Sequence, residues 1–160
     1  MTHTANTALN ISQIGIIGYG EVGKIFAKAL VAQGLTVTAW DIRFASGIPT
    51  ADQANAAADG VRLCASAASL CAAKELVISA VTAGNTLAAA QDAAPHLIQG
   101  TVYLDLNSAS PGTKQACAQF IEASGQASYV EAGVMTSVSP YGIAVPMLLG
   151  VKTQQRFFPY

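Results

Sequence analysis

IGIIGYGEVGKIFAKAL, residues 14–30, decides the fold. It begins with a short apolar run that predicts a buried strand over 13–18, and glycines follow where the run ends. After the glycines, apolar side chains recur at the spacing of one helix face, and the lysines fall on the opposite face. The stretch therefore predicts a strand, a tight turn and an amphipathic helix that ends at Gly34. The apolar helix positions are Val22, Ile25, Phe26, Ala29 and Leu30.

Outward from this stretch, apolar runs alternate with helical segments along the chain. Further strands are predicted over 36–40, 61–64, 75–81, 101–107, 127–134 and 142–150. Further helices are predicted within 42–60, 66–74, 84–97 and 110–124, the third of them broken near Pro95. This alternation is typical of a doubly wound, mostly parallel sheet with helices on both faces. The predicted fold class is therefore α/β of the Rossmann type.

The glycines at 18–23 fit the pattern G-x-G-x-x-G. Here the pattern leaves a predicted strand and opens a predicted helix, which is the context that a dinucleotide-binding turn requires. The first glycine permits the turn, the second lets a pyrophosphate approach the backbone, and the third lets the helix lie close to the sheet. The helix start would bind the pyrophosphate. The predicted cofactor contacts in this turn are Gly18, Tyr19, Gly20, Glu21, Val22 and Gly23.

An acidic residue, Asp41, follows the second predicted strand. It lies near the separation of about 20 residues that is expected for the acid that binds the adenosine ribose. Its carboxylate would accept hydrogen bonds from the ribose hydroxyls and repel a 2′-phosphate, which favours NAD. Arg43 could pair with that phosphate, so NADP stays open. Two alternatives also stay open: a glycine turn that binds nothing, and a methyltransferase.

Two loops rich in hydroxyl and amide side chains are predicted to meet the glycine turn at the carboxyl ends of the strands. They are residues 79–85 and residues 106–112. Asn107 and Ser108 in the second loop are predicted to contact a small-molecule substrate. Ser110, directly before a proline, is predicted to cap the following helix.

The composition excludes several classes of function. The net charge is −1, so neither nucleic acid nor an anionic membrane is an expected partner. No apolar run reaches the about 18 residues of a membrane span, and the polar start has no signal-peptide pattern. The three cysteines lie far apart, which indicates reduced thiols in a cytoplasmic protein and no metal site. Only 11% of the residues are charged, against about 25% in ordinary domains, which predicts a face buried against a partner.

Three stretches together resemble one family: residues 14–30, VISAV at 77–81 and YLDLNSASPGTKQ at 103–115. They are similar to the N-terminal NAD(P)-binding domain of the β-hydroxyacid dehydrogenases, which include 6-phosphogluconate and 3-hydroxyisobutyrate dehydrogenases. The resemblance implies nicotinamide-side contacts at Val81 and Thr82 and substrate contacts at Asn107 and Ser108. The family's serine and Gly-Gly pair are replaced within EAGVMTSVSP, residues 131–140, so the substrate stays open.

The resemblance also implies an oxidoreductase that transfers hydride between a nicotinamide and a hydroxy acid, with a lysine base in a second, helical domain. The family pattern stops before that domain, so no catalytic residue is predicted and Lys114 is predicted to be solvated. We expect an incomplete enzyme whose exposed apolar face meets a helical domain or a homodimer partner. The alternative is a stand-alone dinucleotide-binding or sensing module. The predicted divisions are a flexible leader (1–11), the NAD(P)-binding domain (12–150) and a divergent tail (151–160).

Overall fold

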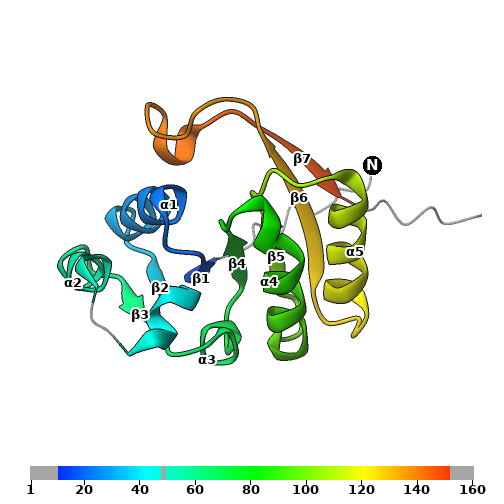
Figure 1. Cartoon of the computed structure of the whole chain (residues 1–160), viewed down its shortest axis with the longest axis horizontal. Helices are drawn as coiled ribbons and strands as arrows, with labels where there is room; N and C mark the ends of the chain where they lie inside the picture. Colours follow the sequence, from blue (N-terminus) through cyan, green and yellow to red (C-terminus); the bar gives the residue numbers. More distant parts are fainter. Residues whose placement is uncertain (1–10, 48–49, 152–160) are drawn as a thin grey trace, which may run out of the picture.

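The computed structural model describes residues 11–47 and 50–151, and within these ranges the chain forms a seven-stranded sheet. The strands are β1 Gln13–Ile17, β2 Thr36–Trp40, β3 Arg62–Leu63, β4 Leu76–Ser79, β5 Val102–Asp105, β6 Ser128–Val134 and β7 Met147–Val151. Their order is β3-β2-β1-β4-β5-β6-β7 (Figure 1). Strands β1 to β6 are parallel, and β7 is antiparallel to β6. The predicted Rossmann-type α/β fold is confirmed.

Helices cover both faces of this sheet. The helices are α1 Glu21–Ala32, α2 Ala51–Ala58, α3 Ala67–Cys71, α4 Thr86–Ala93 and α5 Pro111–Glu122. Short 3-10 helices are η1 Ile42–Ser46, η2 Ala83–Asn85, η3 Ala94–His96 and η4 Gly142–Ala144. One core cluster contains the buried side chains of α1 and α2, and a second contains those of α3, α4 and α5. The sheet therefore separates two apolar layers, as a doubly wound fold requires.

The strand order places a crevice beside β1. From β1 the chain steps outward to β2 and β3, and it then crosses to β4 on the other side of β1. The helices that follow the neighbouring strands β1 and β4 consequently lie on opposite faces. At such a point the carboxyl ends of the strands open into a ligand site.

Local sequence features set the ends of the helices. Gly34, after α1, has a φ of +84°, as predicted for a left-handed residue that ends a helix. The Ser110 hydroxyl accepts a hydrogen bond from the N–H of Thr113, so Ser110 caps α5 as predicted. Helix α4 ends at Ala93, two residues before Pro95, which fits the predicted break.

Segment 142–150 differs from the predicted continuous strand. It first forms η4, which packs against α1, and β7 begins only at Met147 (Figure 1). Gly142 has a φ of +57°, a conformation outside the extended region. Pro146 has no N–H to donate to a strand ladder. These two residues delay the start of the strand.

Large apolar side chains remain exposed within the described part of the chain, at Ile42, Ile98, Phe120, Met135, Tyr141, Leu148 and Leu149. Three of them, Met135, Leu148 and Leu149, lie on or next to the hairpin of β6 and β7 at one edge of the sheet. The partner expected on an apolar face stays a prediction. Over residues 11–47 and 50–151, no helix is long and apolar enough to cross a membrane. The predicted leader and tail lie outside the described residues, apart from Ile11 and Val151.

Candidate dinucleotide-binding site

Two glycines of the turn after β1 are required by close backbone contacts. Gly18 has a φ of +93°, and a Cβ atom there would collide with the carbonyl oxygen of Ala80. A Cβ atom on Gly23 would collide with the carbonyl oxygen of Gly18. The first contact brings the turn against the end of β4, and the second brings α1 against the turn. The roles predicted for these two glycines agree with this geometry.

Gly20 differs from both, because a Cβ atom there would meet no heavy atom within 4 Å. Gly20 is the N-cap residue of α1, and no side chain caps this helix start. The first N–H groups of a helix have no partner within the helix, and the helix dipole attracts negative charge to them. The glycine thus leaves room for an anion next to backbone donors, which is the arrangement that binds a pyrophosphate.

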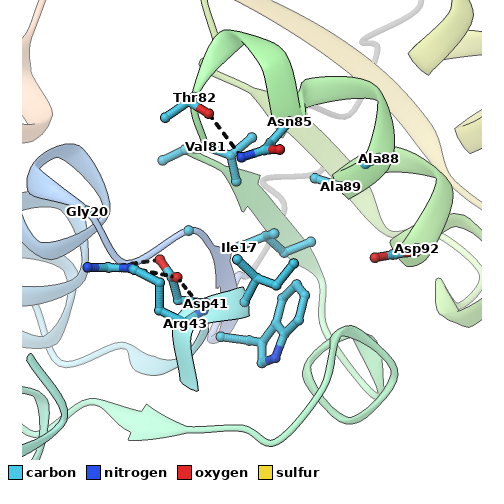
Figure 2. A pocket seen from close by; sticks show the side chains of 14 residues that line it. Ile17, Gly20, Asp41, Arg43, Val81, Thr82, Asn85, Ala88, Ala89 and Asp92 are labelled. Carbon is cyan, nitrogen blue, oxygen red and sulfur yellow. Dashed lines mark hydrogen bonds and ion pairs between the residues drawn. The ribbon is translucent and has the colours of Figure 1, made fainter. Parts of the chain in front are cut away.

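A cavity of about 310 Å³ lies next to this turn, between the ends of β1, β2 and β4 and helix α4 (Figure 2). Six predicted residues line it: Gly18, Gly20, Asp41, Arg43, Val81 and Thr82. Eight further lining residues were not predicted as contacts: Ile17, Trp40, Ile42, Ala80, Asn85, Ala88, Ala89 and Asp92. Ile42 directly follows Asp41, the acid predicted to bind the ribose, and its place in the sequence was the available signal. The α4 residues gave no such signal, because a helix of alanines does not show which face is covered.

Asp41 lies at the carboxyl end of β2, and only 8% of its surface is exposed. Its Oδ2 accepts a hydrogen bond from the N–H of Tyr19 at 2.7 Å, and its Oδ1 accepts one from the N–H of Arg43 at 3.0 Å. Burial alone would raise the pKa of Asp41, but hydrogen bonds from Arg43 and Tyr19 and the charge of Arg43 lower it below its ordinary value. Asp41 is therefore an anion at neutral pH.

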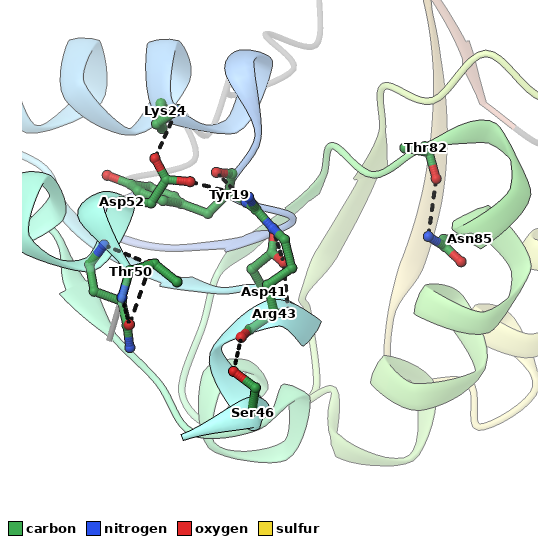
Figure 3. A network of polar contacts seen from close by, with 10 residues as sticks. Tyr19, Lys24, Asp41, Arg43, Ser46, Thr50, Asp52, Thr82 and Asn85 are labelled. Carbon is green, nitrogen blue, oxygen red and sulfur yellow. Dashed lines mark hydrogen bonds and ion pairs between the residues drawn. The ribbon is translucent and has the colours of Figure 1, made fainter. Parts of the chain in front are cut away.

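The guanidinium of Arg43 donates two hydrogen bonds to the carboxylate of Asp41 (Figure 3). Its Nε lies 2.8 Å from Oδ1 of Asp41, and its Nη2 lies 3.0 Å from Oδ2. Nη2 also donates to the carbonyl oxygen of Tyr19 at 3.0 Å, and Nη1 donates to Asp52 at 3.2 Å. The hydrogen bond to Asp41 is the main cause of the raised pKa of Arg43. Arg43 thus ties the acid, the glycine turn and helix α2 together.

The lowered pKa of Asp41 predicts how stability depends on pH. Such a carboxyl stabilises the fold above its unfolded-state pKa of about 3.9, and this contribution is lost as the pH falls through the lower folded-state pKa. We expect Asp41→Asn to be less stable than the wild type by a constant amount between about pH 5 and 7, and by less below about pH 4. Denaturant unfolding at each pH measures the difference. A difference that persists unchanged at about pH 2 would contradict the assignment.

Asn107 joins two loops at the carboxyl ends of β4 and β5. Its Oδ1 accepts a hydrogen bond from the N–H of Val81 at 2.7 Å, and its Nδ2 donates to Oγ of Ser79 at 2.9 Å. Asn107 is buried and does not line the cavity, whereas Ser108 is exposed. The substrate contacts of these two residues stay predictions. The structure adds a role for Asn107, which holds Val81 in the cavity wall.

The other predicted residues of the turn lie outside the cavity wall. The side chain of Tyr19 is buried, and its ring centroid is 6.1 Å from that of Phe44. Glu21 is exposed and Val22 is partly buried in the first turn of α1. Thr82, across the cavity, accepts a hydrogen bond from Nδ2 of Asn85 at 3.0 Å (Figure 2).

In the described ranges, no group of three or more histidine, cysteine or acidic residues is placed to hold a metal ion.

Comparison with protein families agrees with this geometry. The family model for the NAD binding domain of 6-phosphogluconate dehydrogenase matches residues 13–140. The chain belongs to this family. It is an NAD(P)-binding domain of the hydroxyacid dehydrogenase type. A search of curated protein sequences finds no match.

Solved structures support the same assignment. This NAD(P)-binding domain is 37% identical to a conserved hypothetical protein from Sinorhizobium meliloti 1021, with a TM-score of 0.78 over 87% of this chain and 46% of that chain. It is 30% identical to MTH1747, a protein reported to resemble 3-hydroxyacid dehydrogenases, with a TM-score of 0.71 over 85% and 48% of the two chains. Mycobacterium tuberculosis 3-hydroxyisobutyrate dehydrogenase, solved with L-serine, shares the fold at 22% identity, with a TM-score of 0.76 over 88% and 46%. The domain spans about half the length of these relatives.

The prediction that Lys114 is solvated is wrong. In this NAD(P)-binding domain its side chain is 5% exposed, and its Nζ lies 3.1 Å from Oδ1 of the fully buried Asp105. The other oxygen of Asp105 accepts a hydrogen bond from the hydroxyl of Tyr129 at 2.6 Å. Burial, the hydrogen bond to Asp105 and the charge of Asp105 raise the pKa of Tyr129, so its phenol stays protonated and donates. Lys114 is buried because it shares one face of α5 with Cys117 and Ile121.

Oδ1 of Asp105 also accepts a hydrogen bond from the N–H of Asn107 at 2.8 Å. The buried ion pair is thereby linked to the residue that holds Val81. An ion pair and hydrogen bonds therefore connect Lys114 of α5, through Asp105 and Asn107, to the cavity wall. Figure 1 shows α5 and α4 side by side.

Proposed function

We propose that this domain binds NAD(H) in preference to NADP(H), as the cofactor-binding part of an oxidoreductase that acts on a hydroxy acid. The observation that carries the proposal is the position of the Asp41 carboxylate, which lines the same cavity as the open glycine turn at Gly20. The pyrophosphate would bind at the start of α1, and Asp41 would accept hydrogen bonds from the adenosine ribose. The nicotinamide, when bound, supplies the hydride acceptor or donor.

The contacts of Arg43 support the preference for NAD. Its Nε, Nη1 and Nη2 all donate to groups of the protein. Without breaking these hydrogen bonds, a 2′-phosphate could gain only the second N–H of Nη1, and it would approach the ionised Asp41. Like charges at short range are unfavourable, so the geometry favours a ribose with free hydroxyls.

A base for the proton of the substrate hydroxyl is not assigned among the described residues. Lys24 and Lys28 pair with carboxylates of the α2 region, and Lys74 and Lys114 are buried. None of these four lines the cavity. We therefore propose the hydroxy-acid reaction, its substrate and the participation of other chain segments. The family supports this proposal, and so does a solved relative that is reported to resemble 3-hydroxyacid dehydrogenases.

We also propose a cytoplasmic location. Cys64, Cys71 and Cys117 are unpaired by disulfides, and the last two are buried. Burial raises the pKa of Cys71 to about 12, so this thiol stays protonated. Thiols that are not paired in disulfides are typical of proteins in a reducing compartment.

Titration of the purified chain with NADH and with NADPH, followed by cofactor fluorescence or heat of binding, tests the cofactor proposal. We expect NADH to bind more tightly. Asp41→Asn is expected to weaken NADH binding about tenfold, because a hydrogen bond to a charged acceptor contributes about 1.5–3 kcal/mol. Asp59→Asn is the control, since Asp59 also forms an ion pair but does not line the cavity, and it is expected to bind NADH as the wild type does. Binding of neither cofactor to the folded chain would overturn the proposal.

A further inference from the structure

The carboxylate of Asp52 bridges two cations at the rim of the cavity (Figure 3). Its Oδ1 lies 2.9 Å from Nζ of Lys24, which belongs to α1. Its Oδ2 lies 3.2 Å from Nη1 of Arg43, which belongs to η1. Asp52 does not line the cavity itself, but it contacts the guanidinium that does.

The position of Asp52 is set by helix α2. Asp52 lies in the first turn of this helix, whose start is fixed by a capping box between Thr50 and Gln53. Its side chain is 20% exposed, whereas that of Arg43 is 51% exposed. The less exposed acid thus fixes the Nη1 end of the guanidinium, whose Nε and Nη2 already donate to Asp41 and to the carbonyl oxygen of Tyr19.

The charges around Asp41, which directly follows β2, are balanced. Asp41 and Asp52 supply two negative charges, and Arg43 and Lys24 supply two positive charges. Loss of Asp52 would leave two cations beside one carboxylate. It would also release Nη1 of Arg43, the end of the guanidinium that does not contact Asp41.

We propose that Asp52 is a specificity-determining residue for the cofactor. It holds Arg43 against Asp41 and neutralises Lys24, and both effects disfavour the 2′-phosphate of NADP. The inference rests on the proposed function, since it requires the adenosine ribose to lie at Asp41. Asp52 acts through Arg43 and Lys24, without contact to the cofactor.

The test compares NADH and NADPH affinities of Asp52→Asn with those of the wild type. We expect the affinity for NADPH, relative to NADH, to rise about threefold to tenfold. Asp59→Asn is the matched control, because Asp59, directly after α2, pairs with Lys28 of α1 at 3.0 Å and not with Arg43 or Lys24. It removes a similar ion pair and is expected to leave the ratio unchanged. The shift in Asp52→Asn should shrink as salt rises, because salt screens exposed charges.

Three further variants separate the outcomes. In an Arg43→Ala background, Asp52→Asn is expected to lose the part of its effect on the ratio that acts through Arg43, which a general loosening of α2 would not do. Lys24→Gln, which removes a cation, is expected to shift the ratio toward NADH. An unchanged ratio in Asp52→Asn with tight NADH binding would overturn this inference and leave the proposed function standing. Binding of neither cofactor by the wild type would overturn both.

Discussion

Lys114→Met is expected to lower the free energy of unfolding by about 3–5 kcal/mol. The variant keeps the apolar stem of the side chain and removes only the ammonium group 3.1 Å from Asp105. The carboxylate of Asp105 is then buried without a counter-charge. The hydrogen bonds from Tyr129 and Asn107 remain, but they compensate only part of the cost of burying an ion.

Lys28→Met is the control for this result. The side chain of Lys28 is 70% exposed and also pairs with a carboxylate, that of Asp59. Exposed pairs contribute at most about 1 kcal/mol, so the control should be nearly as stable as the wild type. Urea denaturation of both variants measures the difference.

A double variant, Lys114→Met with Asp105→Asn, tests the cause of the loss. With the buried charge removed, much of the lost stability should return. If Lys114→Met costs no more than Lys28→Met, the ion pair is not a major contribution to the fold. If the double variant is no better than the single one, the cost comes from packing of the lysine.

The elements nearest the glycine turn were predictable because their signals are local. Residues 14–30 contain an apolar run, a glycine spacing and a helical period, and each is read from neighbouring positions. The strand over 36–40 was predicted with the bounds that the structure has. The structural roles expected of Gly18 and Gly23 agree with the structure, because a positive φ and a close helix approach each demand the one residue without a Cβ.

The polar networks were not predictable in the same way. From the sequence, Lys114 looks like a solvated helix residue. In the structure it contacts Asp105, which lies nine residues earlier in the chain. Asp52 is an ordinary first-turn acid in sequence, and only the fold brings it to Arg43 and Lys24. Such pairings depend on which helix faces which strand end, and no local spacing encodes that.

Gly20→Ala is expected to separate binding from folding. The backbone of Gly20 has a φ of −79°, which any residue can adopt, and the added methyl group would meet no protein atom. We therefore expect a change of less than about 1 kcal/mol in the free energy of unfolding. The methyl group would instead fill the space assigned to the pyrophosphate. Loss of one or two charge-assisted hydrogen bonds predicts NADH binding about 10- to 100-fold weaker.

Gly23→Ala is the opposite case and completes the comparison. Its methyl group would collide with the carbonyl oxygen of Gly18, so α1 must move away from the turn. Overpacking of this kind costs about 1–3 kcal/mol, and the variant should lose stability together with binding. Thermal unfolding and NADH titration of the two variants therefore give different patterns. If Gly20→Ala binds NADH as the wild type does, the pyrophosphate does not lie at this helix start, and the site must be placed elsewhere in the crevice.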